Sequence, residues 1–266
     1  MTTTAPPRVR IDGLTMTYRP KKRAEVLALD GVDVSIAANS FVSVIGPSGC
    51  GKSTLLKVIS KVVGFTDGRV EIDGVPIAQA DLTGRLSFMF QQPLLLPWRT
   101  VLDNVLLPVQ ILRRRVRPED RDRALRLLDL VGLGSSLQML PHQLSGGMKQ
   151  RVALARALVT EPEILLMDEP FGAVDEITRE TLQVELLRIW QETRTTIVLV
   201  THHVEEAVLL SDRVIVMSAR PGRVVVDQEI DLPRPRDESV RETEAFHGLV
   251  DRLRAQLRPD TREAQQ

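Results

Sequence analysis

The chain has 266 residues, enough for one large domain or two small ones. Hydrophobic residues make up 43% of it, as in globular proteins with a core, and its 35 basic and 35 acidic residues give zero formal net charge. This balance gives no general argument for binding nucleic acid, and the single cysteine, Cys50, excludes disulfides within the chain. Met1–Pro7 lacks the apolar core of a signal peptide, and no apolar run approaches the roughly 18 residues of a membrane span.

The first third of the chain predicts short strands around one helix. Apolar and polar residues alternate in Arg8–Tyr18, which favours an edge strand, and Pro20–Arg23 is expected to be a solvated loop. The other expected elements are a helix at Lys52–Val63 and strands at Val32–Ile36, Phe41–Ile45, Arg69–Ile72 and, in the core, Leu86–Phe90.

The segment between the strand Phe41–Ile45 and the helix that follows fits the phosphate-binding pattern G-x-x-x-x-G-K-[ST]. Because glycine lacks a Cβ atom, such a loop can turn its backbone N–H groups toward phosphate oxygens, and the helix N-terminus adds positive charge. Lys52 supplies a full charge for the terminal phosphates, and the Ser53 hydroxyl can ligate Mg2+. We therefore expect a phosphate site made of Gly46, Pro47, Ser48, Gly49, Cys50, Gly51, Lys52, Ser53 and Thr54.

Between Gln92 and Ala157 the pattern becomes mostly helical, which predicts a helical subdomain inserted in an α/β core. The apolar segment Leu94–Trp98 has two interpretations: a loop packed on its own domain, or a surface that accepts a helix of a partner. The run Arg113–Arg117 is expected to be a solvated helix end. Helices are expected at Val101–Arg113, Pro118–Val131 and Gly147–Val159.

The α/β pattern resumes at Ile164–Met167, a continuous apolar run typical of a buried parallel strand. An amphipathic helix is expected within Val240–Leu257, and Pro259–Gln266 is expected to fray. Between them we expect helices at Thr178–Glu192 and Val204–Leu210, and strands at Thr196–Val200, Val214–Met217 and Val224–Val226.

Two further stretches carry residues suited to nucleotide chemistry. Asp168 and Glu169 follow a predicted parallel strand, where open α/β sheets bind ligands; the first can hold Mg2+ and the second can polarise water. Ser145 is a natural N-cap, and Gly146 and Gly147 leave the first N–H groups of the next helix uncovered. That helix start can bind an anion, although an ordinary capped helix would carry the same residues.

With these residues in place, Leu144–Arg151 resembles the signature of the ABC-type ATPases, the motor subunits of ABC transporters. Gly46–Thr54 is similar to the Walker A loop of that family, and Ile164–Glu169 to its Walker B strand. The resemblance implies an α/β P-loop NTPase core with an antiparallel β edge and an inserted helical subdomain at about 92–157. The implied domain spans 8–235, and a C-terminal helix and tail follow at 236–266.

The resemblance also assigns catalytic and metal-binding roles. Glu169 would be the catalytic glutamate, and Asp168, together with Ser53, would hold Mg2+. Gln91 would ligate Mg2+ and sense a transmembrane partner. His202 would contact the γ-phosphate; His203 stands where the family commonly has Asp, and the spacing from the strand favours His202.

The remaining implied residues contact the nucleotide. Tyr18 would stack on adenine, and the Ser145–Gly147 helix start would face ATP across two copies of the chain. Gly172–Asp175 resembles the D-loop, with Val174 where leucine is common and Asp175 at the nucleotide.

The branch of the family is indicated by four stretches that resemble the nitrate/sulfonate/taurine importers of bacteria: Gln91–Val101, Asp103–Val105, Ala219–Arg223 and Asp231–Arg236. This resemblance implies ATP and Mg2+ as cofactors and an ATP-dependent homodimer on a membrane permease. It further implies a periplasmic or lipoprotein substrate-binding protein, no nucleic acid, and a peripheral position at the cytoplasmic membrane face. The transported substrate stays open.

Two alternatives stay open, namely an ABC-type ATPase of another importer branch and a P-loop ATPase not coupled to transport. Other P-loop classes fit less well. A kinase would not need Ser145–Gly147, and a GTPase would carry an Asn-Lys-x-Asp motif, which the sequence lacks. A chromosome-maintenance ATPase would need a heptad insertion longer than Gln92–Leu144.

Overall fold

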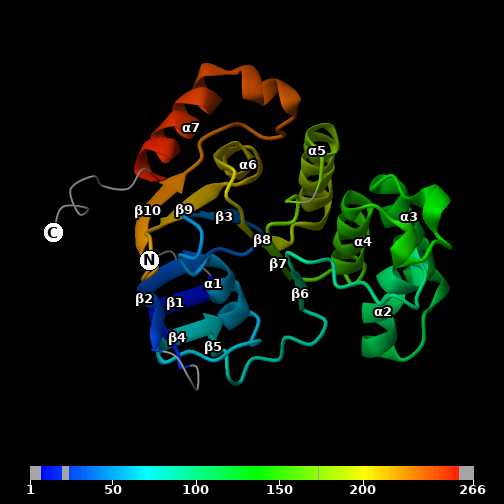
Figure 1. The fold of residues 1–266 in the computed structure, drawn as a ribbon, viewed down its shortest axis with the longest axis horizontal. Coiled ribbons are helices and arrows are strands. Elements are labelled where there is room, and N and C mark those ends of the chain that lie inside the picture. The colour runs from blue at the N-terminus through cyan, green and yellow to red at the C-terminus, as the bar shows by residue number, and fades with distance from the viewer. Residues whose placement is uncertain (1–6, 20–23, 173, 258–266) are drawn as a thin grey trace, which may run out of the picture. The chain divides into compact units, whose positions relative to one another are not determined.

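The computed structural model describes residues 7–19, 24–172 and 174–257, which form two compact units (Figure 1). The first unit comprises Met1–Ala80 and Val198–Gln266, and the second comprises Asp81–Ile197. Outside the described residues lie the N-terminal segment 1–6, the expected loop Pro20–Arg23, Ala173 of the D-loop resemblance, and the tail from residue 258. The domain limits 8–235 and 92–157 stay predictions.

The first unit contains an antiparallel sheet with the strand order β2-β1-β4-β5 (Figure 1, blue to cyan). Strand β1 (Val9–Tyr18) lies between β2 (Val26–Ile36) and β4 (Asp67–Ile72), and β5 is the short Val75–Pro76. The prediction of an edge strand at Arg8–Tyr18 was therefore wrong. Alternating apolar residues indicate one buried face of an antiparallel strand, but they do not indicate what pairs with its edges.

Strand β3 (Phe41–Ile45), which leads into the phosphate loop, lies between β9 (Arg213–Met217) and β8 (Thr196–Val200). β3 and β9 are parallel, and β10 (Val224–Glu229) pairs with β9 in the antiparallel direction. All residues of β3 are buried, as expected for a parallel strand covered on both faces. β8 begins in the second unit and ends in the first.

Three helices accompany these strands: α1 (Lys52–Ile59), α6 (Val204–Leu210) and α7 (Glu244–Leu257). α7 packs against α6, and α6 against β3 (Figure 1). α1 ends earlier than the expected Val63, because Lys61 adopts a φ of +61° and so leaves the helical conformation. A 3-10 helix at Glu238–Glu242 precedes α7.

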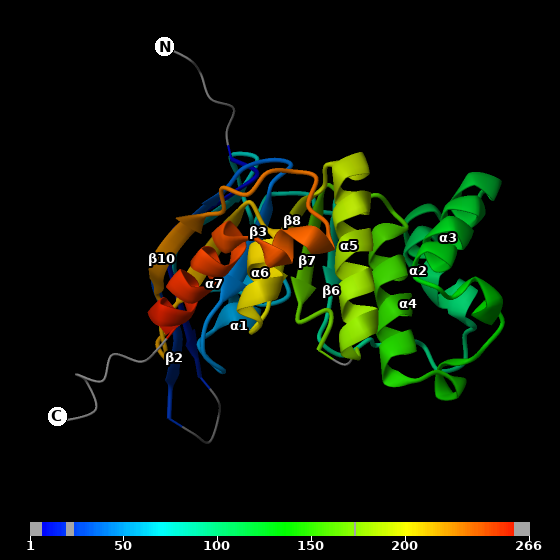
Figure 2. The same ribbon diagram turned by 90° about the horizontal axis from the view of Figure 1, so that it is seen from above.

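The second unit combines a parallel strand pair with four helices. β6 (Leu86–Met89) pairs with β7 (Ile164–Asp168), but most residues of β6 are only half-buried, so its predicted place in the core was wrong. Helices α2, α3 and α4 pack on one another (Figure 2). The helices are α2 (Val101–Arg113), α3 (Pro118–Leu130), α4 (Gly146–Leu158) and α5 (Glu176–Thr193), with 3-10 turns at Gly134–Ser136 and Pro141–Gln143.

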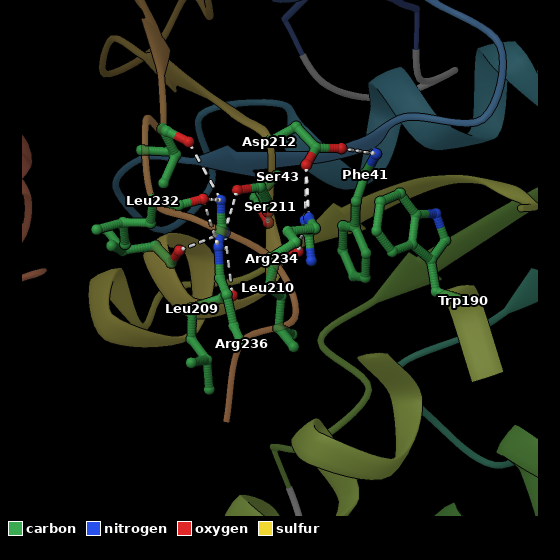
Figure 3. Close-up of polar contacts among 12 residues, drawn as sticks. Phe41, Ser43, Trp190, Leu209, Leu210, Ser211, Asp212, Leu232, Arg234 and Arg236 are labelled. Carbon is green, nitrogen blue, oxygen red and sulfur yellow. Dashed lines mark hydrogen bonds and ion pairs between the residues drawn. The ribbon is translucent and has the colours of Figure 1, made fainter. Parts of the chain in front are cut away.

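A buried arginine ties the segment after β10 to the end of α6 (Figure 3). Arg236 is 3% exposed, and burial lowers its pKa to about 10, so its guanidinium stays protonated at neutral pH. Carbonyl groups at a helix C-terminus attract a cation. The guanidinium donates to the carbonyl oxygens of Val208, Leu209, Ser211, Ile230 and Leu232, with distances of 2.7–3.4 Å.

Asp212 extends this polar network to the strand that precedes the phosphate loop (Figure 3). One of its carboxylate oxygens accepts from Arg234 Nε at 2.9 Å, and the other accepts from the backbone N–H of Phe41 at 2.9 Å. The stretch Asp231–Arg236, which resembles the importer branch, thus has a structural role in the first unit.

We expect Arg236→Met to lower the free energy of unfolding by about 3 kcal/mol or more, because several buried carbonyl groups lose their donor at once. Urea denaturation followed by circular dichroism measures this change. Arg254→Met is the matched control, because Arg254 is exposed on α7 and pairs at the surface with the half-buried Glu205; it should cost less than about 1 kcal/mol. Equal losses in both variants would contradict this role of Arg236.

Candidate nucleotide site

The phosphate loop Gly46–Thr54 joins β3 to α1, and close packing fixes its shape. Gly49 and Gly51 have φ angles of +75° and +101°, in the left-handed region that favours glycine. A Cβ atom on Gly51 would lie 2.7 Å from the Leu29 side chain, and one on Gly46 would lie 2.8 Å from the Met217 carbonyl oxygen. Glycine is therefore required here by backbone conformation and by space, and successive turns of this kind form anion-binding concavities.

Lys52 is the first residue of α1 and only 7% exposed. Its ammonium donates to the carbonyl oxygens of Gly46 at 2.8 Å and Pro47 at 3.0 Å, so the charge is held against the loop. The positive end of α1 adds to this charge. The site therefore fits a phosphate group, as the sequence predicts.

Tyr18 and Thr54 connect the antiparallel sheet to the phosphate loop. The Tyr18 hydroxyl lies 3.2 Å from the Thr54 hydroxyl, so the end of β1 is next to the first turn of α1, which also contains Ser53. The Tyr18 side chain is half-buried, and stacking of its ring on adenine stays a prediction.

Both histidines of the predicted switch lie between β8 and α6 in the first unit. Their rings are 4.1 Å apart at the centroids. His202 is exposed, whereas His203 is half-buried, is the N-cap residue of α6, and donates its backbone N–H to the Thr201 hydroxyl at 3.0 Å. The greater exposure of His202 agrees with the choice made from strand spacing, but its contact with a phosphate stays a prediction.

In the second unit, the structure brings together two predicted residues that are far apart in the chain. Gln91 follows β6 and Glu169 follows β7, and Gln91 Nε2 donates to Glu169 Oε2 at 2.9 Å. Glu169 has a φ of +48°, which is uncommon for a residue with a side chain and is typical of functional sites. Asp168 is the buried last residue of β7. The hydrogen bond between Gln91 and Glu169 was not predicted, because no local pattern in the sequence indicates it.

Two helix starts of the second unit carry the remaining predicted residues. The Ser145 hydroxyl accepts from the Met148 N–H at 3.2 Å, so Ser145 is the N-cap expected, with Gly146 and Gly147 opening α4. Asp175 caps α5 by accepting from the Thr178 N–H at 3.0 Å, and this hydrogen bond lowers the pKa of the Asp175 carboxyl. The capping role was missed, although Asp directly before a helical pattern is a common helix-start signal.

The loop before α2 presents exposed apolar side chains. Trp98 is 73% exposed and Leu94 is 55% exposed, so neither is packed on its own domain. Asn104, fully buried, holds this loop: its side chain accepts from the Leu96 N–H at 2.8 Å and donates to the carbonyl oxygens of Leu96, Arg99 and Thr100. Of the two interpretations of Leu94–Trp98, the packed loop is therefore wrong for these two residues.

Within the part of the chain that the structure describes, none of the helices has the length and apolar content to cross a membrane. The fold groups the predicted residues into two sets. The first unit holds Tyr18, the phosphate loop and His202, and the second holds Gln91, Ser145–Gly147, Asp168, Glu169 and Asp175.

Comparison with known proteins gives a consistent result. A family model described as "ABC transporter" matches residues 29–172. The chain is 42% identical over 254 residues to a taurine import ATP-binding protein of Rhizobium johnstonii, covering 94% of this chain and 96% of that one. It is 44% identical over 220 residues to a nitrate import ATP-binding protein of Synechococcus elongatus, covering 82% and 80%. A dimeric bacterial ABC transporter cassette of known structure is similar with a TM-score of 0.77 and 36% identity, covering 85% of this chain and all of the cassette.

We expect Lys52→Ala to weaken ATP binding by about 10- to 100-fold, because backbone amides alone cannot replace a charged donor to phosphate. Turnover should fall with binding. Titration with a fluorescent ATP analogue measures the affinity. Lys57→Ala removes the same charge from the other end of α1 and should bind like the parent; unchanged binding in Lys52→Ala would contradict the phosphate-site assignment.

Proposed function

Because the chain belongs to the ABC transporter family of ATP-binding proteins, we propose that it is the motor subunit of a bacterial importer for a small anion of the nitrate, sulfonate or taurine type. As a member of this family it binds and hydrolyses ATP. The observation that carries the importer branch is the similarity to a taurine import protein over 94% of this chain. The resemblance of Gln91–Val101 and Ala219–Arg223 to that branch supports the same conclusion.

The residues of the nucleotide site fit ATP with Mg2+. Lys52 and the glycine-rich loop suit the phosphates, and Tyr18 would stack on the base. Mg2+ would be held by Ser53, Gln91 and Asp168, whose hydroxyl, amide and carboxylate oxygens are ligands that this ion accepts, and it would neutralise charge on the phosphates.

The proposed chemistry places one proton acceptor at the end of β7. Glu169 would accept a proton from the attacking water, and the hydrogen bond from Gln91 would hold its carboxylate in position until then. His202 would donate to the γ-phosphate as charge develops there. Since Gln91 is in contact with Glu169, a partner that moves Gln91 would also change the position of the proton acceptor.

We further propose that two copies of the chain enclose two ATP molecules. The exposed start of α4, with Ser145 as N-cap and two glycines behind it, suits the phosphates of an ATP bound to the other copy. Asp175 would contact the nucleotide at the same interface. The similar cassette of known structure is described as dimeric, which supports this arrangement.

The partner surface proposed for the permease is the loop Leu94–Trp98. Exposed aromatic residues are common anchors of protein interfaces, and Asn104 fixes the loop that carries Trp98, so little ordering is needed on binding. A periplasmic or lipoprotein substrate-binding protein would complete the system. The chain would then lie at the cytoplasmic face of the membrane as a peripheral subunit.

An ABC-type ATPase of another importer branch, or one without a transport role, is the alternative. The two proposals differ in how the ATPase responds to a permease of the nitrate, sulfonate or taurine type in proteoliposomes. Stimulation by the permease, with its substrate-binding protein loaded, supports the importer. Equal turnover with and without the permease favours the alternative.

We expect Glu169→Gln to slow ATP hydrolysis by about 100- to 10,000-fold, because the amide keeps the size of the side chain but cannot accept the proton. ATP binding should persist, because the change removes a negative charge near the phosphates. The variant should therefore be a monomer without nucleotide and a stable dimer with Mg-ATP in light scattering.

Two controls test this result. Glu192→Gln makes the same change at an exposed position on α5 and should hydrolyse ATP like the parent. Adding Ser145→Arg to Glu169→Gln should abolish the dimer, because the long side chain blocks the start of α4. A Glu169→Gln chain that stays monomeric at saturating ATP, or that hydrolyses ATP at the parent rate, would refute the mechanism.

We expect Trp98→Ala to keep the ATPase of the isolated subunit within about twofold and to weaken stimulation by the permease, because truncating an interface aromatic typically costs more than 1 kcal/mol of binding. Proteoliposome ATPase assays measure both quantities. Ile111→Ala is the control, because Ile111 is an equally exposed apolar residue on α2 outside this loop. Equal stimulation of Trp98→Ala and the parent would argue against this partner surface.

A further inference from the structure

The proposed function uses the turn Ser218–Arg223, which joins β9 to β10 in the first unit, only as a sign of the importer branch and gives its residues no physical role. Arg220 in this turn reaches the phosphate loop. Its Nε donates to the carbonyl oxygen of Gly49 at 2.9 Å, and Gly49 is one of the two loop glycines with a left-handed backbone. The bond orients the Gly49 carbonyl toward the turn.

Gly222 makes the closest approach between the turn and the loop. A Cβ atom on Gly222 would lie 1.9 Å from the Cys50 carbonyl oxygen, a distance that real side chains do not reach. The φ of Gly222 is not positive, so glycine is required here by space alone. The carbonyls of Gly49 and Cys50 therefore both lie against this turn.

The turn is itself anchored to β2. The N–H of Gly222 donates to the Ala28 carbonyl at 3.0 Å, and its carbonyl accepts from the Asp30 N–H at 3.0 Å. The phosphate loop contacts the same part of β2, since a Cβ atom on Gly51 would lie 2.8 Å from the Ala28 carbonyl oxygen. Turn, loop and strand thus meet at Ala28.

Hydrogen bonds within the turn keep it rigid. The backbone N–H of Ser218 donates to the Arg223 carbonyl at 2.9 Å. The Ser218 hydroxyl accepts from the Arg223 N–H at 3.0 Å and donates to the Pro221 carbonyl at 3.0 Å. A turn fixed in this way can impose its shape on the loop that it touches.

We propose that Arg220 and Gly222 are positioning residues for the phosphate loop, which hold it in its nucleotide-binding shape. A loop binds phosphate through backbone N–H groups only when its dihedral angles are already set, and setting them on binding costs conformational entropy. By holding the carbonyls of Gly49 and Cys50 against itself, the turn keeps these two oxygens away from the position of a bound phosphate. The proposal rests on nucleotide binding and does not depend on the importer role.

Arg223 provides a matched control within the same turn. It carries the same charge as Arg220, but its guanidinium pairs with Asp30 instead of with a carbonyl of the phosphate loop. If Arg220 acted only by attracting the anionic nucleotide, removing either charge would weaken binding to a similar extent. A positioning role instead predicts a loss for Arg220 alone.

The test measures the affinity of a fluorescent ADP analogue and the thermal midpoint of the nucleotide-free chain for five variants. Arg220→Ala should weaken binding by about five- to tenfold, the usual effect of one hydrogen bond, while Arg223→Ala stays within about twofold. Arg220→Lys keeps a donor and should recover part of the loss. Gly222→Ala should weaken binding more than Arg220→Ala, whereas Gly64→Ala, with open space around it, should have no effect on binding.

A purely structural role would lower the thermal midpoint of Arg220→Ala and leave the affinity of the folded fraction unchanged, which would overturn the proposal. Equal losses in Arg220→Ala and Arg223→Ala would also overturn it and indicate attraction by charge. If Gly222→Ala failed to fold, the Arg220 variants would still test the proposal. The Arg220 side chain is exposed, so its truncation leaves no cavity. If the parent chain itself bound no ADP, the phosphate-site assignment would fail instead.

Discussion

The close approach of backbone segments around the phosphate loop is the constraint on which the first unit depends. Gly46 lies against Met217 of β9, Gly51 against Ala28 and Leu29 of β2, and the loop backbone leaves no room for a side chain at these points. Packing of this density makes the loop a fixed part of the fold, because a shift of either strand would collide with it. A nucleotide therefore meets a site that is already formed, with Lys52 held against it by two hydrogen bonds.

In the second unit, one short stretch of chain carries both a residue that contacts Glu169 and an exposed apolar surface. Gln91 contacts Glu169 through a hydrogen bond, and a few residues later Leu94 and Trp98 are exposed to solvent. Arg156 of α4 donates to the carbonyl oxygens of Pro93 and Leu94, so the segment is also attached to the helix that begins after Ser145. The segment that carries the exposed side chains is thus in direct contact with both Glu169 and α4.

Much of the fold and the site could be predicted because the signals are local. The phosphate loop is specified by glycines at fixed spacing between an apolar strand and a helix. The helix Val101–Arg113 has the predicted limits, with Thr100 as its N-cap and Arg114 as its C-cap. The Ser145 N-cap was predicted on the same basis and is confirmed. Local patterns do not report pairing between strands, which is why Arg8–Tyr18 was placed at an edge and Leu86–Phe90 in the core.

The sequence by itself indicated the chemistry proposed for the site: which residues would bind phosphate, which carboxylates follow a parallel strand, and which helix start would be open to an anion. Tertiary structure alone decided the contacts between residues distant in the chain, such as Gln91 with Glu169, Arg220 with Gly49, and Arg236 with the end of α6. The physical reason is that a hydrogen bond needs two groups within about 3 Å, and only the packed fold sets that distance for residues tens of positions apart. The exposure of Trp98 also depends on the tertiary structure. The sequence shows that the residue is apolar, but only the fold determines whether other residues cover it.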